Sequence, residues 1–359
     1  MTDPKLSILV LADSRSFHTE RYVRELRRQG CHVVLVSLER GNIHHYTLKA
    51  RGFFKQLHYA MAATEVRALI KRLRPDIINP HFVSGYGFTV ALAGGRQAAP
   101  VVTHLWGSDI LLVPDKSGFH KRKTIFALKQ ADCLIGDSKY LMERARALTP
   151  LHEERIMPWG IEREYLRYRR PNLALNRPLR IIVPRPHEKV YNNLFIVRAL
   201  APLVNRGLVE IAFPQWGSLS GHFRLHARSF IGDRLRIYKK LPRSKFLQFM
   251  AQHDLYLSSA LSDSSPASLI EAMGLGLLPI AADIPGVREW LCDSKNGYLY
   301  EPYNAQALHN IIEQLVVNND PKLAWREQNA QRVEQEAIFE NTVADLIALM
   351  HDLRRSRRS

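Results

Sequence analysis

The chain has 359 residues, of which 46% are hydrophobic and 24% charged, a composition typical of a globular protein with room for two domains. No apolar run approaches the ~20 residues that a membrane-spanning helix needs. The three cysteines lie far apart, which argues against a disulfide framework or a metal-type spacing. The formal net charge of +17 is the unusual bulk property.

This positive charge bears on the partners of the protein. No helix-turn-helix, RNA-binding or zinc pattern accompanies it, so no nucleic-acid partner is expected. An anionic membrane surface is the better candidate, because basic patches bind acidic headgroups without a motif. We interpret residues 353–359 as a flexible basic end suited to such adhesion. We expect a cytoplasmic protein, with peripheral association at the inner face of the plasma membrane as an option.

The first half of the chain alternates strand and helix patterns. A buried strand at 6–12, a helix at 19–29 and a strand at 32–38 predict a β-α-β opening of the nucleotide-binding kind. No G-x-G-x-x-G follows the first strand, so a dinucleotide-dependent dehydrogenase loses its main support. Further strands are predicted at 75–82, 100–109 and 133–136.

Residues 46–74 form a basic, amphipathic pattern that predicts a helix. Packing of its apolar side against the sheet is the favoured interpretation. The alternative is a segment that lies on lipid headgroups, for which Phe53 and Phe54 beside Arg51 and Lys55 are the local evidence.

The second half begins after a polar, arginine-rich stretch at 162–178 and again alternates strand and helix patterns. Both halves have strands of the buried type, which predicts an α/β protein with two Rossmann-like β/α domains facing across a cleft. Such a cleft is the default ligand site. The strands of the second half are predicted at 179–183, 208–213, 236–238, 255–260 and 278–282.

The stretch from 255 to 282 predicts a compact strand-loop-helix-strand unit. A helix that begins near Ser268 after a serine-rich loop presents backbone N–H groups and a positive dipole end, which suit a diphosphate. Asp263 and Glu271 lie around this helix start, and carboxylates accept hydrogen bonds from sugar or ribose hydroxyls. A nucleotide sugar offers both kinds of group.

The same block resembles a known family. An acidic residue, seven others and Glu271, continued by the Ala-Met-x-x-Gly-x-x-Pro of 272–279, is similar to the E-x7-E signature of family-4-type glycosyltransferases of the GT-B fold. The stretches 283–289 and 296–299 are similar to the segments downstream of that signature in the family. The sequence departs from the pattern at Asp263, where the family has Glu; the shorter side chain keeps the acceptor chemistry but differs in reach.

The resemblance implies a domain division and a reaction. It implies an N-terminal acceptor domain at 1–165, a linker at 166–178, a donor domain at 179–335, and a C-terminal helix at 336–359 that crosses back to the first domain and carries the basic tail. The implied reaction is retaining transfer from a nucleotide sugar, with UDP-sugar favoured, to a lipid-linked or cell-surface glycan at the membrane face. No metal and no other cofactor is expected.

The resemblance also implies donor-site roles. Arg185 would clamp the diphosphate, with Lys189 as the nearby lysine, although a surface salt bridge is the alternative for either residue. Glu271 would accept ribose hydroxyls, and Ser268 and Leu269 would supply backbone N–H groups to phosphate. The other predicted donor contacts are Ser265, Gly217 and Tyr238.

The first domain would supply acceptor-side and catalytic groups. Asp109 is either a site group or a helix N-cap. Family members carry a His where this chain has Trp106, and His104 shares the strand face of that position; a hydrogen-bonded core histidine is the alternative. The predicted catalytic set is Asp263, Arg185, His104 and Asp109, and the acceptor-side set is His18, Arg15 and His81.

Two rival functions stay open on the sequence. A nucleotide-sugar epimerase or hydrolase of the same fold would consume the donor without an acceptor. A non-catalytic basic protein that binds nucleic acid or membranes would not bind nucleotide sugars.

Overall fold

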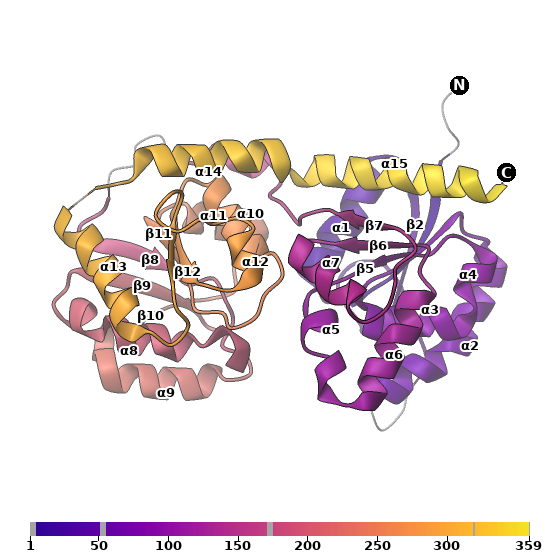
Figure 1. The fold of residues 1–359 in the computed structure, drawn as a ribbon, viewed down its shortest axis with the longest axis horizontal. Coiled ribbons are helices and arrows are strands. Elements are labelled where there is room, and N and C mark those ends of the chain that lie inside the picture. The colour runs from indigo at the N-terminus through magenta and orange to yellow at the C-terminus, as the bar shows by residue number, and fades with distance from the viewer. Residues whose placement is uncertain (1–4, 51–54, 171–174, 319, 359) are drawn as a thin grey trace. The chain divides into compact units, whose positions relative to one another are not determined.

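The computed structural model describes residues 5–50, 55–170, 175–318 and 320–358. The chain divides into two compact units, Met1–Pro158 together with Glu340–Ser359, and Trp159–Phe339 (Figure 1). Each unit is an α/β layer structure around a parallel sheet, so the predicted fold class of two Rossmann-like domains is confirmed.

The first unit is built on parallel strands in the order β3-β2-β1-β4, followed by β5-β6-β7. Isolated parallel bridges from Ile78 to Val101 and from His81 to His104 link β4 to β5. The chain order reverses between β1 and β4, because β2 and β3 lie on one side of β1 and the later strands on the other. The bounds are β1 (Ser7–Leu11), β2 (His32–Ser37), β3 (Tyr46–Thr47), β4 (Ile77–Pro80), β5 (Val102–His104), β6 (Cys133–Gly136) and β7 (Glu154–Ile156).

Helices cover this sheet because their apolar residues recur at helical spacing. In α2 (Lys55–Leu73), Ala62, Val66, Leu69 and Ile70 pack into the core with strand residues, as the favoured interpretation of this segment expects. The helix begins later than the predicted 46, because Tyr46 and Thr47 pair with β2 as strand β3. Phe53 and Phe54, on which the lipid-surface alternative depends, lie outside the described residues. The other helices are α1 (Phe17–Arg28), η1 (Phe82–Gly87), α3 (Phe88–Ala93), α4 (Gly95–Ala98), α5 (Ser108–Leu111), η2 (Pro114–Lys116), α6 (Gly118–Lys129), α7 (Lys139–Arg146) and α15 (Phe339–Arg358).

The second unit holds one parallel sheet in the order β10-β9-β8-β11-β12-β13. Alternate residues of its strands enter different cores: Leu255 and Leu257 of β11 pack on one face of the sheet, and Tyr256 packs on the other. Burial on both faces explains the near-continuous apolar strands of the sequence. The bounds are β8 (Leu179–Ile182), β9 (Val209–Pro214), β10 (Arg236–Tyr238), β11 (Leu255–Ser258), β12 (Leu278–Ala282) and β13 (Tyr298–Tyr300).

The helices of the second unit include one that the sequence analysis did not predict. This is α9 (Ser220–Ile231), whose buried residues Phe223, Ala227 and Ile231 are spaced four residues apart, whereas its apolar Leu225 and Phe230 are exposed. The others are η3 (Arg163–Tyr168), η4 (Lys189–Tyr191), α8 (Asn193–Asn205), η5 (Gly232–Arg234), α10 (Arg243–Met250), α11 (Ala267–Gly274), α12 (Pro285–Arg288), α13 (Ala305–Asn318) and α14 (Leu323–Glu336).

The boundaries of the two units differ from the predicted domain ranges. The units divide after Pro158 and after Phe339, not after 165 and 335. The described part of the stretch predicted as a linker belongs to the second unit: Arg169 pairs with Glu334, and Arg170 with buried Asp254 at 3.2 Å. Ion pairs of this kind, between residues far apart in sequence, leave no periodic pattern.

The C-terminal residues are helical, not a flexible end. In α15, Arg354 is buried and lies 3.7 Å from Asp76 of the first unit, and the helix continues to Arg358. Gln29 donates a hydrogen bond to the carbonyl of Glu340 at the other end of α15. Within the described residues, no helix has the length and apolar character needed to cross a membrane.

Candidate functional site

The strongest site candidate lies where strands β8 and β11 pair. The chain order of the second sheet reverses between these neighbours, and ligands of open parallel sheets bind at the carboxyl ends of the strands beside such a reversal. The loop after β8 carries Arg185, and the loop after β11 carries Asp263. Both side chains are in contact although 78 positions separate them.

Arg185 is the positive centre of this site. Its guanidinium forms an ion pair with Asp263, lies 3.4 Å from the hydroxyl of Ser268, and stacks 4.2 Å from the ring centre of Tyr191. Burial is the largest single influence and disfavours the charged form, but the combined effect of Asp263 and the neighbouring Tyr191, Tyr256 and Glu271 raises the pKa of Arg185 above its usual value. The buried Nε has no hydrogen-bond partner among the described residues. An anionic ligand would satisfy this donor.

The loop before α11 is held by its neighbours. The hydroxyl of Ser265 is buried and accepts a hydrogen bond from the indole of Trp290 at 2.9 Å. A Cβ on Gly286 would lie 2.0 Å from the carbonyl oxygen of Ser264, so only glycine allows this close approach. Ser265 therefore positions the loop that carries Asp263.

The start of α11 differs in detail from the prediction. The N–H groups of Leu269 and Ile270 both donate to the carbonyl of Pro266, at 2.9 and 3.2 Å. The predicted phosphate contact from the Leu269 N–H is therefore replaced by a bond within the helix. Ser268, one residue earlier, points its hydroxyl toward Arg185 and Tyr256.

Glu271 is held by an arginine that the sequence analysis did not single out. One oxygen of Glu271 accepts a hydrogen bond from Arg243 at 2.6 Å, and the same guanidinium binds Glu162 at 2.7 Å. Burial opposes the charge of Arg243, but the two carboxylates raise its pKa. The Glu271 carboxylate is thus buried in a fixed orientation within the second unit.

The remaining predicted donor contacts occupy different environments. Gly217 has a φ of +130°, and a Cβ there would lie 2.2 Å from the backbone nitrogen of His187. Tyr238 is buried and donates a hydrogen bond to the carbonyl of Val183. Lys189 is exposed in η4. Gly217 and Tyr238 therefore support the loop after β8, and only Lys189 presents a charge to solvent.

A second candidate pocket lies in the first unit, at the reversal between β1 and β4. It has a volume of about 200 Å³, and Asp13, Tyr59, His81, Tyr86 and Trp106 are among its lining residues. Of the predicted acceptor-side residues, His81 lines the pocket. His18 packs edge-on against Trp106, with ring centres 5.6 Å apart, and Arg15 pairs with Asp13 at 2.8 Å.

His81 and His104 form a buried, stacked pair with ring centres 4.4 Å apart. Burial lowers the pKa of His104 to about 3 and that of His81 well below its usual value. Asn79 accepts a hydrogen bond from Tyr22 and lies 3.2 Å from the His81 ring nitrogen, which fixes that ring. His104 is therefore a buried, neutral histidine that stacks on the pocket residue His81.

Asp109 connects helix η1 to the loop after β5. Its carboxylate is buried and accepts backbone hydrogen bonds from Val83 and Trp106, both at 2.8 Å. Burial raises the pKa of Asp109 to about 6, against the effect of these bonds. The residue that caps α5 is Gly107, so Asp109 is not the N-cap. Its geometry is that of a positioning residue that orients Trp106.

Comparison with known proteins adds to this geometry. Residues 7–138 match the family model described as glycosyl transferase 4-like, and residues 223–332 match that of glycosyl transferases group 1. The chain belongs to the family-4-type glycosyltransferases of the GT-B fold. The resemblance inferred from the Asp263–Glu271 block is confirmed.

Individual relatives of this glycosyltransferase family are distant in sequence. TuaC of Bacillus subtilis, whose name assigns it to teichuronic acid biosynthesis, is 25% identical over 277 residues, 72% of this chain and 66% of TuaC. Among solved structures, sucrose-phosphate synthase of Thermosynechococcus elongatus has a TM-score of 0.82 at 14% identity, covering 98% of this chain and 100% of that one. HepE of Anabaena, in complex with UDP-glucose, has a TM-score of 0.77 at 17% identity, covering 95% and 99%. The chain spans slightly less than two thirds of TuaC and of AmsK, an amylovoran biosynthesis glycosyltransferase of Erwinia amylovora.

The candidate site combines residues that the sequence analysis predicted with residues that it missed. The structure brings Arg185, Asp263 and Ser268 together, whereas the partner of Glu271, Arg243, was missed. Trp106 was noted only for occupying a histidine position, yet it lines the first-unit pocket. Within the described residues, no group of three or more His, Cys, Asp or Glu side chains is arranged to hold a metal ion.

Replacing Asp109 with Asn should destabilise the first unit by about 1–3 kcal/mol, because the amide NH2 would face backbone donors that the carboxylate now satisfies. Urea unfolding measures the change. Trp106 is the only tryptophan of this unit, so its fluorescence reports on the unit when the other tryptophans are replaced by Phe. The control is Asp115→Asn, at an exposed carboxylate, and equal stability of both variants would contradict the role assigned to Asp109.

The two buried histidines should make the first unit lose stability as the pH falls, although the raised pKa of Asp109 acts in the opposite direction below about pH 6. His81 and His104 bind protons less readily when folded than when unfolded, so their contribution is complete above about pH 6.5 and falls as the pH drops below that value. Each imidazole should contribute a slope of about 1.4 kcal/mol per pH unit. His104→Gln should reduce the slope measured between pH 7 and 5, and replacing exposed His222 should not. An unchanged slope in His104→Gln would show that the buried pair is not the cause.

Proposed function

We propose that this chain is a retaining glycosyltransferase that moves a sugar from a nucleotide sugar, with UDP-sugar favoured, to a lipid-linked or cell-surface glycan. The observation that carries the proposal is the partly buried cluster of Arg185, Asp263 and Ser268 at the carboxyl ends of β8 and β11. Family membership supports sugar transfer. The UDP-glucose bound to HepE supports the donor class, and the name of TuaC supports a cell-envelope acceptor.

Arg185 would receive the diphosphate of the donor. Its charge is permanent, and its unpartnered Nε can donate to a phosphate oxygen. A guanidinium already fixed by Asp263 and Tyr191 needs little reorganisation as negative charge develops on the leaving group. This arrangement supports our proposal that departure of the diphosphate needs no metal ion.

The chemical step would occur on one face of the sugar. The bond from the anomeric carbon to the diphosphate oxygen breaks, and the acceptor hydroxyl oxygen bonds to the same face of that carbon. The hydroxyl proton passes to an oxygen of the departing nucleoside diphosphate. Asp263, beside Arg185, would accept a hydrogen bond from a sugar hydroxyl, and Glu271 would accept one from the ribose.

The pocket of the first unit would receive the acceptor. Its tyrosine and tryptophan side chains offer apolar rings and hydroxyl groups to a sugar. The neutral state of His81 would let its imidazole take part in a hydrogen bond to the acceptor without adding charge. The net charge of +17 supports association with the cytoplasmic face of an anionic membrane, where a lipid-linked acceptor would be located.

Release of nucleoside diphosphate tests the proposal. The purified protein is incubated with UDP-, GDP- and ADP-sugars, with and without envelope glycans or lipid-linked oligosaccharides. We expect release that depends on the acceptor and formation of an α-linked product from an α-linked donor. Release or isomerisation without an acceptor would favour the epimerase or hydrolase. No binding of any nucleotide sugar by calorimetry would contradict both enzyme functions.

Arg185→Gln should lower kcat by about 100-fold or more, because the charge matters most as the diphosphate departs. Donor affinity should fall less. The control Lys189→Gln removes an exposed charge near the same loop and should change kcat by less than about threefold. Steady-state kinetics with UDP release as the signal separates these cases; comparable kcat in Arg185→Gln and wild type would remove the assignment.

The ribose role of Glu271 predicts discrimination between nucleotides. Wild-type protein should bind UDP about tenfold or more tightly than its 2′-deoxy analogue, because a hydrogen bond to a charged group is lost. Glu271→Gln should bind both nucleotides with similar affinity. The variant Arg243→Gln serves as the control for displacement of Glu271. If Glu271→Gln discriminates as strongly as wild type, Glu271 serves only to hold Arg243.

A further inference from the structure

A large basic pocket lies in the first unit and shares no lining residue with the candidate donor and acceptor sites. It has a volume of about 690 Å³, within the range of small-molecule sites. Asp76 and Pro100, which precede β4 and β5, line it, so it lies at the amino ends of these strands. The candidate acceptor pocket is at their carboxyl ends. The two pockets are therefore on opposite edges of the same sheet.

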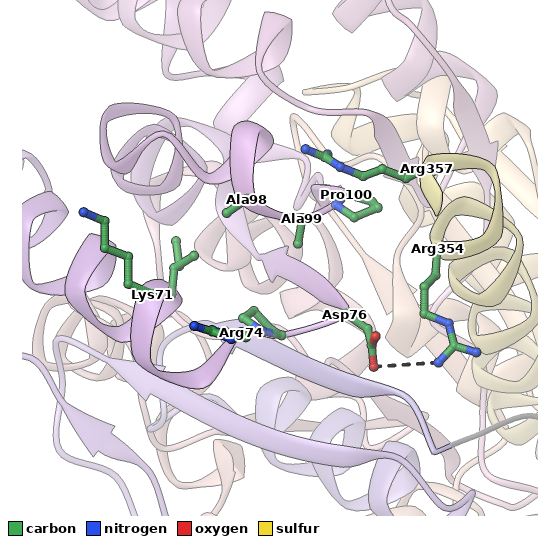
Figure 2. Close-up of a pocket in the computed structure, with 10 residues that line it drawn as sticks. Lys71, Arg74, Asp76, Ala98, Ala99, Pro100, Arg354 and Arg357 are labelled. Atoms are coloured by element: carbon green, nitrogen blue, oxygen red, sulfur yellow. Dashed lines mark ion pairs between the residues drawn. The ribbon is translucent and has the colours of Figure 1, made fainter. Parts of the chain in front are cut away.

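Four cationic side chains surround this pocket. Figure 2 shows Lys71 and Arg74 on one side, at the end of α2, and Arg354 and Arg357 on the other, from the last turns of α15. Ala98, Ala99 and Pro100 lie between the two groups, and these short side chains leave room for a ligand.

Only one of the four cations is neutralised by a lining carboxylate. Asp76 accepts a hydrogen bond from the Ser7 N–H at 3.0 Å and lies 3.7 Å from Arg354. Lys71, Arg74 and Arg357 have no ion-pair partner among the described residues, and each is exposed at the rim. The pocket therefore carries a local charge of about +3, which favours an anion of high charge.

The backbone conformation at Arg74 indicates that its side chain has a function. Arg74 ends α2 in the left-handed conformation, with a φ of +45°, and its N–H donates to Ile70. Such a position favours glycine, and a residue with a side chain costs of order 1 kcal/mol there. An arginine at this position directs its guanidinium into the pocket lining at the expense of stability.

We propose that this pocket binds a phosphate group, as a phosphate ester or diphosphate, at a site separate from the donor and acceptor sites. Arginine favours phosphate because its planar guanidinium makes paired, charge-assisted hydrogen bonds to phosphate oxygens. The volume accommodates more than one phosphate together with the group that carries them. Two sources share this chemistry: the headgroup of an anionic phospholipid and a soluble phosphorylated metabolite.

The test compares two variants that lose the same charge. Arg74→Gln/Arg357→Gln removes two unpaired cations of the pocket. Arg72→Gln/Arg355→Gln removes their sequence neighbours, which are exposed and do not line the pocket. Arg354 is kept because it is buried against Asp76. Thermal unfolding of both variants shows that each is folded.

Binding is measured in two arms at low salt. Pyrophosphate is titrated by calorimetry in the presence of saturating UDP, and co-flotation is measured with vesicles of phosphatidylcholine containing 30% phosphatidic acid. The pocket variant should lose at least about tenfold in affinity in one or both arms, and the control variant less than about twofold. Loss with pyrophosphate alone identifies a soluble ligand, and loss with vesicles alone identifies a lipid headgroup.

The proposal would be overturned if neither variant loses affinity in either arm. It would also be overturned if both variants lose affinity equally, because the loss would then follow from net charge and not from the pocket. UDP binding and sugar transfer without vesicles should be unchanged in either variant. A failure of the transferase proposal therefore leaves this test intact.

Discussion

Pairing of β8 with β11 is the constraint on which the site depends. These strands are neighbours in the sheet although the chain between them forms two further strands and three α-helices. Because they are parallel, their carboxyl ends meet at one edge, and the loops after them bring Arg185 to Asp263. Neither loop has much regular structure of its own. Tight packing at Gly217 and Gly286 holds the two loops in place of hydrogen-bonded secondary structure.

The electrostatics of the second unit result from this convergence. Two guanidinium groups, Arg185 and Arg243, alternate with the carboxylates of Asp263, Glu271 and Glu162. Isolated charges would be too costly to bury, so each arginine is matched by an acid. In the proposed function, the diphosphate would meet an existing network of charges and would compete with Asp263 for Arg185. Donor affinity would then depend on whether Asp263 forms a hydrogen bond to a sugar hydroxyl instead.

The sequence predicted what depends on local pattern. Buried strands such as β6 and β11 appear as short apolar runs, and the spacing of Asp263 and Glu271 around a helix start predicted the candidate donor site. The sequence did not predict that Arg243 holds Glu271. This ion pair joins the start of α10 to α11 across 28 positions, and such a contact leaves no periodic pattern. The arginine-rich stretch before 171 looked like a linker for the same reason: Arg169 and Arg170 are held by acids distant in sequence. Trp106 was underestimated because its role depends on Asp109, whose carboxylate orients the backbone at Trp106.

The positive charges of the chain include two groups at different places in the fold. Part of the positive charge is balanced inside the second unit, where it serves the candidate donor site. Another part gathers at the amino edge of the first sheet, where α2 and α15 end. Cations near helix C-termini are favoured by the negative end of the helix dipole, so Arg74 and Arg357 have an electrostatic reason to be tolerated there. That reason does not require a pocket, and it does not explain why arginine occupies a left-handed position that suits glycine. A bound phosphate accounts for the side chain, the cavity and the unbalanced charge together.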